Sequence, residues 1–257
     1  MCLIVWAQDV HPQYKLIFLA NRDEFYERPA QPAHEWQHPA GVIAGKDLQA
    51  GGTWLGIHPC KGIAALTNYR NPKLIKEQAP SRGVLPVQYF LSQQSSLNYL
   101  VRLHPKSTDY NGFNLLLFDG RDMMYYSNIE RIIKKVDKGI HGLSNALLNT
   151  PWPKLERCKQ ALSRQIEQHN ISLEALFAIM EDTWRPPDEL LPDTGVPREW
   201  ERALASPFIC TSTYGTRLTS VILWDKHDRV QFVEKWHATP CQKPGIRTFE
   251  IKMHLYE

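Results

Sequence analysis

The second residue of the chain is a cysteine, and it opens an apolar run, Cys2 to Ala7, that predicts a buried strand. If an aminopeptidase removes Met1, the mature chain begins with a residue that carries both a thiol and a free α-amine. An α-amine titrates at about 7.7–8.0 and an ordinary thiol at roughly 8.5, so the amine can accept the thiol proton near cellular pH. Cys2 would then supply both a nucleophile and its base. The alternative is that Cys2 is a small hydrophobic residue in an edge strand.

A second apolar run, Tyr14 to Ala20, follows after a short polar link and ends in four polar residues. These are Asn21, Arg22, Asp23 and Glu24, which we call the charged tetrad. Two strands joined by a short link form a hairpin, which returns the far end of the second strand to the start of the first. The sequence therefore predicts that the charged tetrad is a polar turn beside Cys2. A solvated turn with no functional role is the alternative.

The chain resembles the Asn-Arg-Asp-Glu (NRDE) family, which includes the transport-and-Golgi-organisation homologues. The resemblance rests on the order of short motifs along nearly the whole chain. These are Met1-Cys2, Ala20 to Phe25, Arg28-Pro29, Gly51 to Gly56, Asn68-Tyr69-Arg70, Tyr110 to Leu115, Gly142 to Asn145 and Tyr214 to Arg217. The resemblance implies an α+β fold like that of N-terminal-nucleophile (Ntn) hydrolases, a four-layer αββα sandwich of two mainly antiparallel sheets between helical layers.

The same resemblance implies roles for the charged tetrad. In cysteine-type Ntn amidases, to which the chain is similar in plan, an arginine and an aspartate after the second strand hold the nucleophile. By position, Arg22 would lower the thiol pKa through its fixed charge, and Asp23 would hydrogen-bond the ammonium or Arg22. Those amidases usually space the two residues three apart, whereas here they are adjacent. Either Arg22 and Asp23 or Asn21 and Glu24 take these roles.

Further site residues are implied by the family plan. Asn68 and Asn145 each follow an apolar or glycine-containing segment and would donate neutral N–H groups to an oxyanion, although each taken alone is typical of a turn. Arg217 either binds a substrate anion or the carboxylates of the site, or it lies on the surface. Trp54 and Tyr69 are expected to line an apolar substrate cleft, with a place in the core as the alternative.

Two functions agree with these residues. In the first, Cys2 hydrolyses a C–N amide or related acyl bond of a small metabolite through a thioester. In the second, the protein is not an enzyme but carries haem or an acyl lipid in the same cleft. No cofactor or metal is expected, because the ten histidines show no zinc spacing. Haem as cargo would need one axial ligand, for which His34, His38 and His141 are candidates.

Composition limits the other possibilities. The 257 residues include 30 basic and 27 acidic side chains, a balance too even to predict a nucleic-acid partner. Five widely spaced cysteines are an odd number and favour reduced thiols over a disulfide framework. The N-terminus shows no basic segment before its short apolar run, so it predicts neither a signal peptide nor a membrane span. We expect a soluble cytoplasmic protein with a small-molecule or amphipathic ligand.

The pattern along the chain predicts one domain over residues 1–257. Continuous apolar runs favour strands that are buried on both faces. Ser81 to Leu103 predicts one helix, or two helices with a break at its polar centre. Apolar stripes beginning at Leu155 and Leu173 predict two more helices, the second capped by Ser172. The segment from Asp182 to Pro197 is rich in proline and acidic residues and predicts a surface excursion, either a lid or a passive loop.

Overall fold

The computed structural model describes residues 2–168, 171–240 and 242–255. These residues form two mainly antiparallel sheets and a few helices, which confirms the predicted α+β class. The chain divides into two compact units. Unit 1 holds residues up to 27, 70–73 and 138–250, and unit 2 holds residues 28–69, 74–137 and those from 251 onward. The expectation of one domain stays a prediction.

Unit 1 contains a six-stranded sheet in the order β10-β1-β2-β11-β12-β13. Its strands are β1 (Cys2–Gln8), β2 (Tyr14–Phe25), β10 (Gly139–Leu143), β11 (Tyr214–Asp225), β12 (Arg229–Trp236) and β13 (Gly245–Lys252). Its helices are α3 (Pro153–Glu167), α4 (Leu173–Met180) and α5 (Arg198–Ala203). The segment between α4 and α5 has little regular structure and is largely exposed, as its prolines predict.

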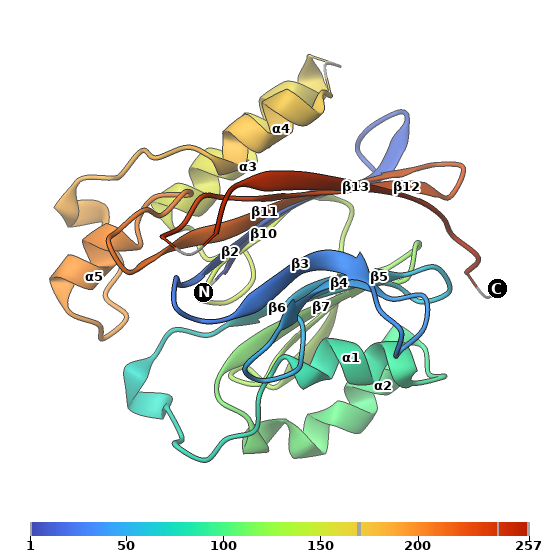
Figure 1. Cartoon of the computed structure of the whole chain (residues 1–257), viewed down its shortest axis with the longest axis horizontal. Coiled ribbons are helices and arrows are strands. Elements are labelled where there is room, and N and C mark those ends of the chain that lie inside the picture. Colours follow the sequence, from blue (N-terminus) through green and yellow to red (C-terminus); the bar gives the residue numbers. More distant parts are fainter. Residues whose placement is uncertain (1, 169–170, 241, 256–257) are drawn as a thin grey trace. The chain divides into compact units, whose positions relative to one another are not determined.

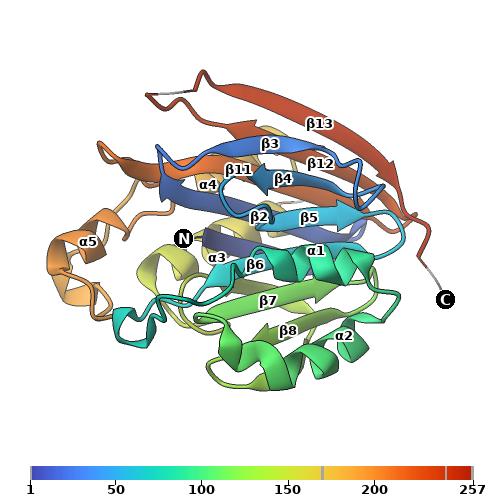
Figure 2. The same ribbon diagram turned by 60° about the horizontal axis from the view of Figure 1, so that its bottom comes forward.

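Helices α3 and α4 cover one face of this sheet, with α3 packed on β1 and β10 and α4 on β2 and β11. Figure 1 and Figure 2 show both helices on the same side of β2 and β11. The helical stripe of Leu155, Cys158 and Leu162 packs against the alternate residues Leu3 and Val5 of β1. The Ser172 hydroxyl accepts from the Ala175 amide and caps α4, as predicted. Since β1 is buried throughout Leu3–Ala7, its other face is buried as well, as its continuous apolar run predicts.

Unit 2 contains a seven-stranded antiparallel sheet in which strands follow one another in chain order. They are β3 (Ala30–Glu35), β4 (Ile43–Asp47), β5 (Leu55–His58), β6 (Gly62–Asn68), β7 (Phe113–Phe118), β8 (Met123–Ser127) and β9 (Ile132–Val136). Helices α1 (Val84–Leu91) and α2 (Ser96–Leu103) pack on this sheet. The predicted helix over Ser81 to Leu103 is thus two helices, because the Ser95 side chain caps a new one.

The structure corrects one expectation about the charged tetrad. The second strand does not end at Ala20 in a turn, because β2 continues through the tetrad to Phe25. The reason is a long pairing with β11, in which Asp23 lies opposite Thr216 and Glu24 opposite Gly215. Backbone partners more than 190 residues away in the sequence hold these polar residues in an extended strand, which the local pattern alone does not predict.

In the described part of the chain, no helix has the length and apolar character to cross a membrane.

Candidate active site around Cys2

Cys2 is the first residue of β1 and lies between two strands that carry predicted site residues. On one side it pairs with Arg22 of β2 in antiparallel register, which confirms the predicted hairpin. On the other side β10 pairs with β1, and the Ser144 hydroxyl that follows β10 donates to the Cys2 carbonyl at 3.3 Å. Asn145 is the next residue. The fold therefore brings Arg22 and the Ser144-Asn145 pair to opposite flanks of Cys2, which is partly exposed.

The thiol of Cys2 lies among charges of both signs. Burial raises the pKa of the Cys2 thiol, the Asp23 and Glu24 carboxylates raise it further, and the Arg22 guanidinium opposes them. Burial therefore outweighs the lowering of the Cys2 thiol pKa that was expected from Arg22. A thiol of this kind stays protonated at neutral pH, so it needs a base to become a nucleophile.

The charged tetrad is divided between the two faces of β2, because side chains alternate along a strand. Arg22 and Glu24 point to the face that carries Cys2, and Arg22 Nη2 lies 3.8 Å from Glu24 Oε2. Asn21 and Asp23 point to the face covered by α3 and α4, as do Leu19 and Ile17 before them. The tetrad thus supplies two pairs of residues with different surroundings.

Asn21 has a structural role in this arrangement. Its Nδ2 donates to the carbonyl oxygens of Met180 and Pro207 at 2.8 and 3.0 Å, and its Oδ1 accepts from the Thr219 hydroxyl at 2.7 Å. Asn21 is fully buried, and these bonds join β2 to the end of α4 and to the segment before β11. Asn21 and Glu24 are therefore less suited than Arg22 and Asp23 to hold the nucleophile.

Asp23 lies just beyond Cys2 along the hairpin. Because β2 runs antiparallel to β1 and Arg22 is opposite Cys2, Asp23 is one residue past the N-terminal side of Cys2, where a free α-amine would stand. Its carboxylate is completely buried and accepts from the Thr216 hydroxyl at 2.7 Å. Burial raises the pKa of Asp23, while the Lys154 ammonium, the Thr216 hydrogen bond and Arg70 lower it.

Arg70 connects Asn145 to the segment around α5. Its backbone N–H donates to the Asn145 carbonyl at 2.7 Å, and its Nη1 donates to Glu201 Oε2 at 2.8 Å. The side chains of Arg70 and Glu201 are 6% and 2% exposed, so this is a buried ion pair. The guanidinium also lies 4.8 Å from the ring centroid of Trp152. Asn145 is itself fully buried and is held in place from Arg70.

Lys154 is a charged residue of this region that the sequence analysis missed. It lies in the first turn of α3, is 3% exposed, and donates from Nζ to the Leu204 carbonyl at 2.9 Å. A signal for it exists in the sequence, since Lys154 precedes Cys158 by four residues and so continues the apolar stripe of the helix. Arg70 and Glu201 gave no comparable signal, because they are 131 residues apart.

The remaining predicted residues fall in two places. Arg217 is in unit 1 and is buried, so it is not a surface arginine, and its Nη1 donates to the Phe25 carbonyl at 3.0 Å. It sits at an irregularity in the β2–β11 pairing, between Thr216 and Leu218. Asn68 is the last residue of β6, Trp54 directly precedes β5, and Tyr69 directly follows β6. All three residues belong to unit 2. Their part in the site stays a prediction.

The candidate haem ligands are placed as follows. His34 Nδ1 is 2.9 Å from the Pro32 carbonyl, and His141 Nδ1 is 3.0 Å from Asn149 Nδ2. His38 precedes Pro39 across a cis peptide bond. Residues 2–168, 171–240 and 242–255 hold no group of three or more histidine, cysteine or acidic side chains suited to a metal ion.

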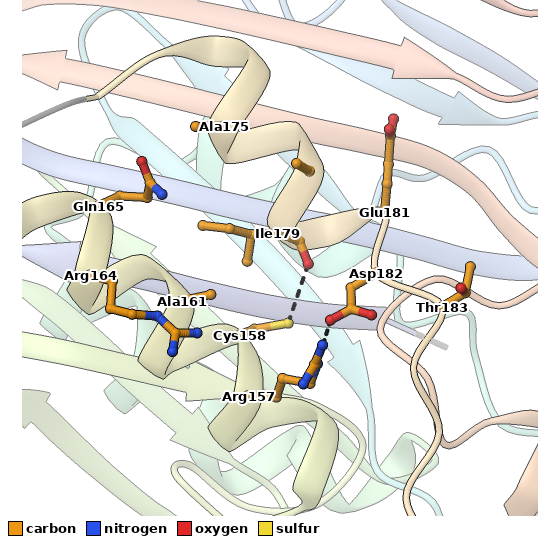
Figure 3. Close-up of a pocket in the computed structure, with 11 residues that line it drawn as sticks. Arg157, Cys158, Ala161, Arg164, Gln165, Ala175, Ile179, Glu181, Asp182 and Thr183 are labelled. Atoms are coloured by element: carbon orange, nitrogen blue, oxygen red, sulfur yellow. Dashed lines mark hydrogen bonds and ion pairs between the residues drawn. The ribbon is translucent and has the colours of Figure 1, made fainter.

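The other described cysteines differ from Cys2 in their surroundings. Cys158 is buried in α3, where its thiol donates to the Ile179 carbonyl at 3.7 Å and burial raises its pKa to about 12 (Figure 3). It lies at the base of a groove of about 530 Å³ between α3 and α4, which an Arg157–Asp182 ion pair crosses. Cys60 is partly exposed and Cys210 exposed, while Cys241 and Met1 lie outside the described residues.

The chain is similar in sequence to known proteins along most of its length. The chain is 39% identical over 256 residues to the Transport and Golgi organization protein 2 homolog of Bos taurus, covering 91% of this chain and 92% of that one. It is 36% identical over 258 residues to the homolog of Homo sapiens, with the same two shares. It is 31% identical over 280 residues to Transport and Golgi organization protein 2 of Drosophila melanogaster, covering 95% and 98%.

Among solved structures, an N-acylethanolamine-hydrolyzing acid amidase ortholog of Caenorhabditis elegans shows a TM-score of 0.37 at 7% identity, covering 87% of this chain and 92% of that one. Residues 1–238 match the family model described as Transport and Golgi organisation 2. This match, together with relatives of 31–39% identity over more than nine-tenths of the chain, shows that the protein belongs to the Transport and Golgi organisation 2 family.

Proposed function

We propose that Cys2 is the nucleophile of an acyl-transfer reaction that hydrolyses a C–N amide or related acyl bond of a small metabolite. The observation that carries this proposal is the position of Cys2 at the end of β1, opposite Arg22 and hydrogen-bonded by Ser144 on its other side. The proposal requires removal of Met1, because only a free α-amine can accept the thiol proton. With Met1 retained, the nitrogen of Cys2 would be an amide and no base.

The proposed chemistry follows from these groups. The α-amine takes the proton from the Cys2 thiol, and the sulfur attacks the acyl carbon. The carbonyl oxygen then carries the negative charge, for which the side-chain amide of Asn145 is a suitable donor. The α-ammonium returns its proton to the leaving amine as the C–N bond breaks, leaving a thioester. Water hydrolyses the thioester to a carboxylic acid and restores the thiol.

The raised pKa of the Cys2 thiol supports the need for such a base. Because burial and the carboxylates of Asp23 and Glu24 raise the thiol pKa, the thiolate is formed only when a proton acceptor lies within reach. Asp23 is suited to hold the α-ammonium, since it lies one residue beyond Cys2 and is itself fixed by Thr216. Arg22, on the same face as Cys2, is suited to bind the thiolate or a substrate carbonyl.

The test is the mass of the intact purified protein, followed by labelling with an electrophilic acyl probe. We expect the protein to lack Met1 and the probe to label Cys2 selectively, read out by peptide mass spectrometry. Cys158 is an internal control, because its thiol is buried and its pKa is raised to about 12. Cys2→Ala should abolish turnover, whereas Cys210→Ser, at an exposed cysteine, should not change it.

Retention of Met1, or full biological activity in Cys2→Ala, would refute the nucleophile. In that case the alternative, a carrier of haem or an acyl lipid, takes its place. Haem titration distinguishes the two, because a carrier that uses His34, His38 or His141 should lose its Soret band when that histidine is changed.

A further inference from the structure

Lys154 occupies a place where a lysine is unfavourable for two reasons. It is 3% exposed, so its ammonium has lost nearly all contact with water. It also follows Pro153 in the first turn of α3, where the partial positive charge of the helix end repels a cation. The Leu204 carbonyl, which accepts from Nζ at 2.9 Å, satisfies one of three N–H donors but does not balance the charge.

The opposite charge that acts most strongly on Lys154 is that of Asp23. Asp23 is fully buried on the face of β2 that α3 and α4 cover, and α3 packs directly on β1 and β10 beside it. Of the charged groups that act on Asp23, Lys154 lowers its pKa most, and Asp23 is in turn the charge that most raises the pKa of Lys154. Burial nevertheless lowers the pKa of Lys154 to about 8.

The other charged side chains near Lys154 and Asp23 have ion-pair partners of their own. Arg70, which acts on both partners, is bound to Glu201 at 2.8 Å. Arg22 and Glu24 face the opposite side of β2 and lie 3.8 Å from one another. The thiols of Cys158, on the same helix, and of Cys2, on β1, also act on Lys154 electrostatically, and Asp23 acts in the same way on Tyr214 of β11. Thr216 donates to Asp23 but carries no charge.

We propose that Lys154 is a positioning residue of the Cys2 site, whose buried ammonium keeps Asp23 ionised so that Asp23 can hold the α-ammonium of Cys2. The inference rests on the proposed function. It gives the adjacent Arg-Asp pair of the charged tetrad a partner from a distant helix, and it explains why a cation is kept in the first turn of α3. Lys154 itself touches no reacting atom and exchanges no proton with the substrate.

The test compares Lys154→Met with Lys154→Arg, which keeps the charge, and with Lys159→Met. Lys159 lies on the same helix and binds Glu156 at 3.0 Å near the surface, so it controls for loss of a lysine from α3. The first readout is the carboxyl ¹³C titration of Asp23, assigned by its loss in Asp23→Asn. A neighbouring buried cation lowers a carboxyl pKa by about 1–3 units, and Lys154 is the charge that lowers the pKa of Asp23 most, so Lys154→Met should increase the proton affinity of Asp23 roughly tenfold or more.

The second readout is the rate at which Cys2 is labelled by the acyl probe at pH 7. We expect Lys154→Met to slow labelling roughly tenfold, Lys154→Arg to restore most of the rate, and Lys159→Met to leave it unchanged. If the Asp23 titration is the same in Lys154→Met as in the unaltered protein, the inference is wrong. If the titration moves but Cys2 is unreactive in every variant, the charge pair stands and it is the proposed function that fails.

Should Lys154→Met not fold, the unaltered protein still gives a decision. The ¹⁵Nζ resonance of Lys154 should titrate near pH 8, and Asp23→Asn should move that midpoint to lower pH, because the balancing charge is gone. A Lys154 midpoint that Asp23→Asn leaves in place would overturn the inference.

Discussion

The buried ion pair between Arg70 and Glu201 makes a sharp prediction about stability. Glu201→Gln keeps the shape of the side chain and can still accept from Thr194, whose N–H and hydroxyl now donate to Glu201 at 2.9 and 2.6 Å. It removes only the charge, and so leaves the Arg70 guanidinium buried without its counter-charge. Removing one partner of a buried pair typically costs about 3–5 kcal/mol.

We expect the lower end of that range. Arg70 keeps the face of Trp152 at 4.8 Å, and a cation over an aromatic ring recovers part of the lost stabilisation, on the order of 1 kcal/mol. A loss of about 3 kcal/mol is a large fraction of the roughly 5–15 kcal/mol that stabilises a typical protein, and it changes the ratio of folded to unfolded protein roughly 100-fold.

The assay is urea unfolding followed by tryptophan fluorescence, since the chain contains eight tryptophans. The matched control is Asp188→Asn in the same segment, where Asp188 and Arg202 are 43% and 51% exposed. Water replaces the partner of an exposed ion, so the control should be indistinguishable from the unaltered protein. We also expect Glu201→Gln to slow labelling of Cys2 in the folded protein, because Arg70 holds the Asn145 carbonyl at 2.7 Å. A change in unfolding free energy no larger than that of Asp188→Asn would refute the reasoning.

Two further predictions concern the face of the sheet covered by α3 and α4. His237 Nε2 lies 2.8 Å from the Thr219 hydroxyl oxygen, and burial lowers the pKa of His237 to about 4. The folded protein therefore binds fewer protons than the unfolded chain between about pH 6.5 and 4. The neutral His237 ring therefore adds to the free energy of unfolding above about pH 6.5, and this stabilisation is lost as the pH falls toward 4. For a partly exposed ring we expect the stabilisation to be about 1–2 kcal/mol. His237→Gln should weaken the fall in unfolding free energy from pH 7 to pH 5, and an unchanged slope would contradict the buried neutral ring. Asn21→Ala should cost about 3 kcal/mol in urea unfolding, because it leaves the Met180 and Pro207 carbonyls buried without their donor; a cost below 1 kcal/mol would argue against its structural role.

Local sequence was enough to predict the hairpin that opens the chain. Two apolar runs with a short polar link have few other ways to bury their side chains, and their pairing places Arg22 opposite Cys2. The helical stripes of α3 and α4 and the Ser172 cap followed from periodicity in the same way. The continuation of β2 through the charged tetrad did not, because it depends on pairing with β11 near the other end of the chain.

The sequence by itself therefore determined which residue could be a nucleophile and which charged residues would stand next to it, since both lie on one hairpin and neighbours along a hairpin are neighbours in space. Only the tertiary structure decided which side of β2 each member of the tetrad faces and which distant groups reach it. Thr216 donates to Asp23 across 193 residues of sequence, and Arg70 donates to Glu201 across 131. The charge of Lys154, in the first turn of α3, acts on Asp23. The physical reason is that a buried charge is costly unless other groups pair with it. Those groups come from segments far apart in the sequence that only the complete fold brings together, so no local sequence pattern predicts them.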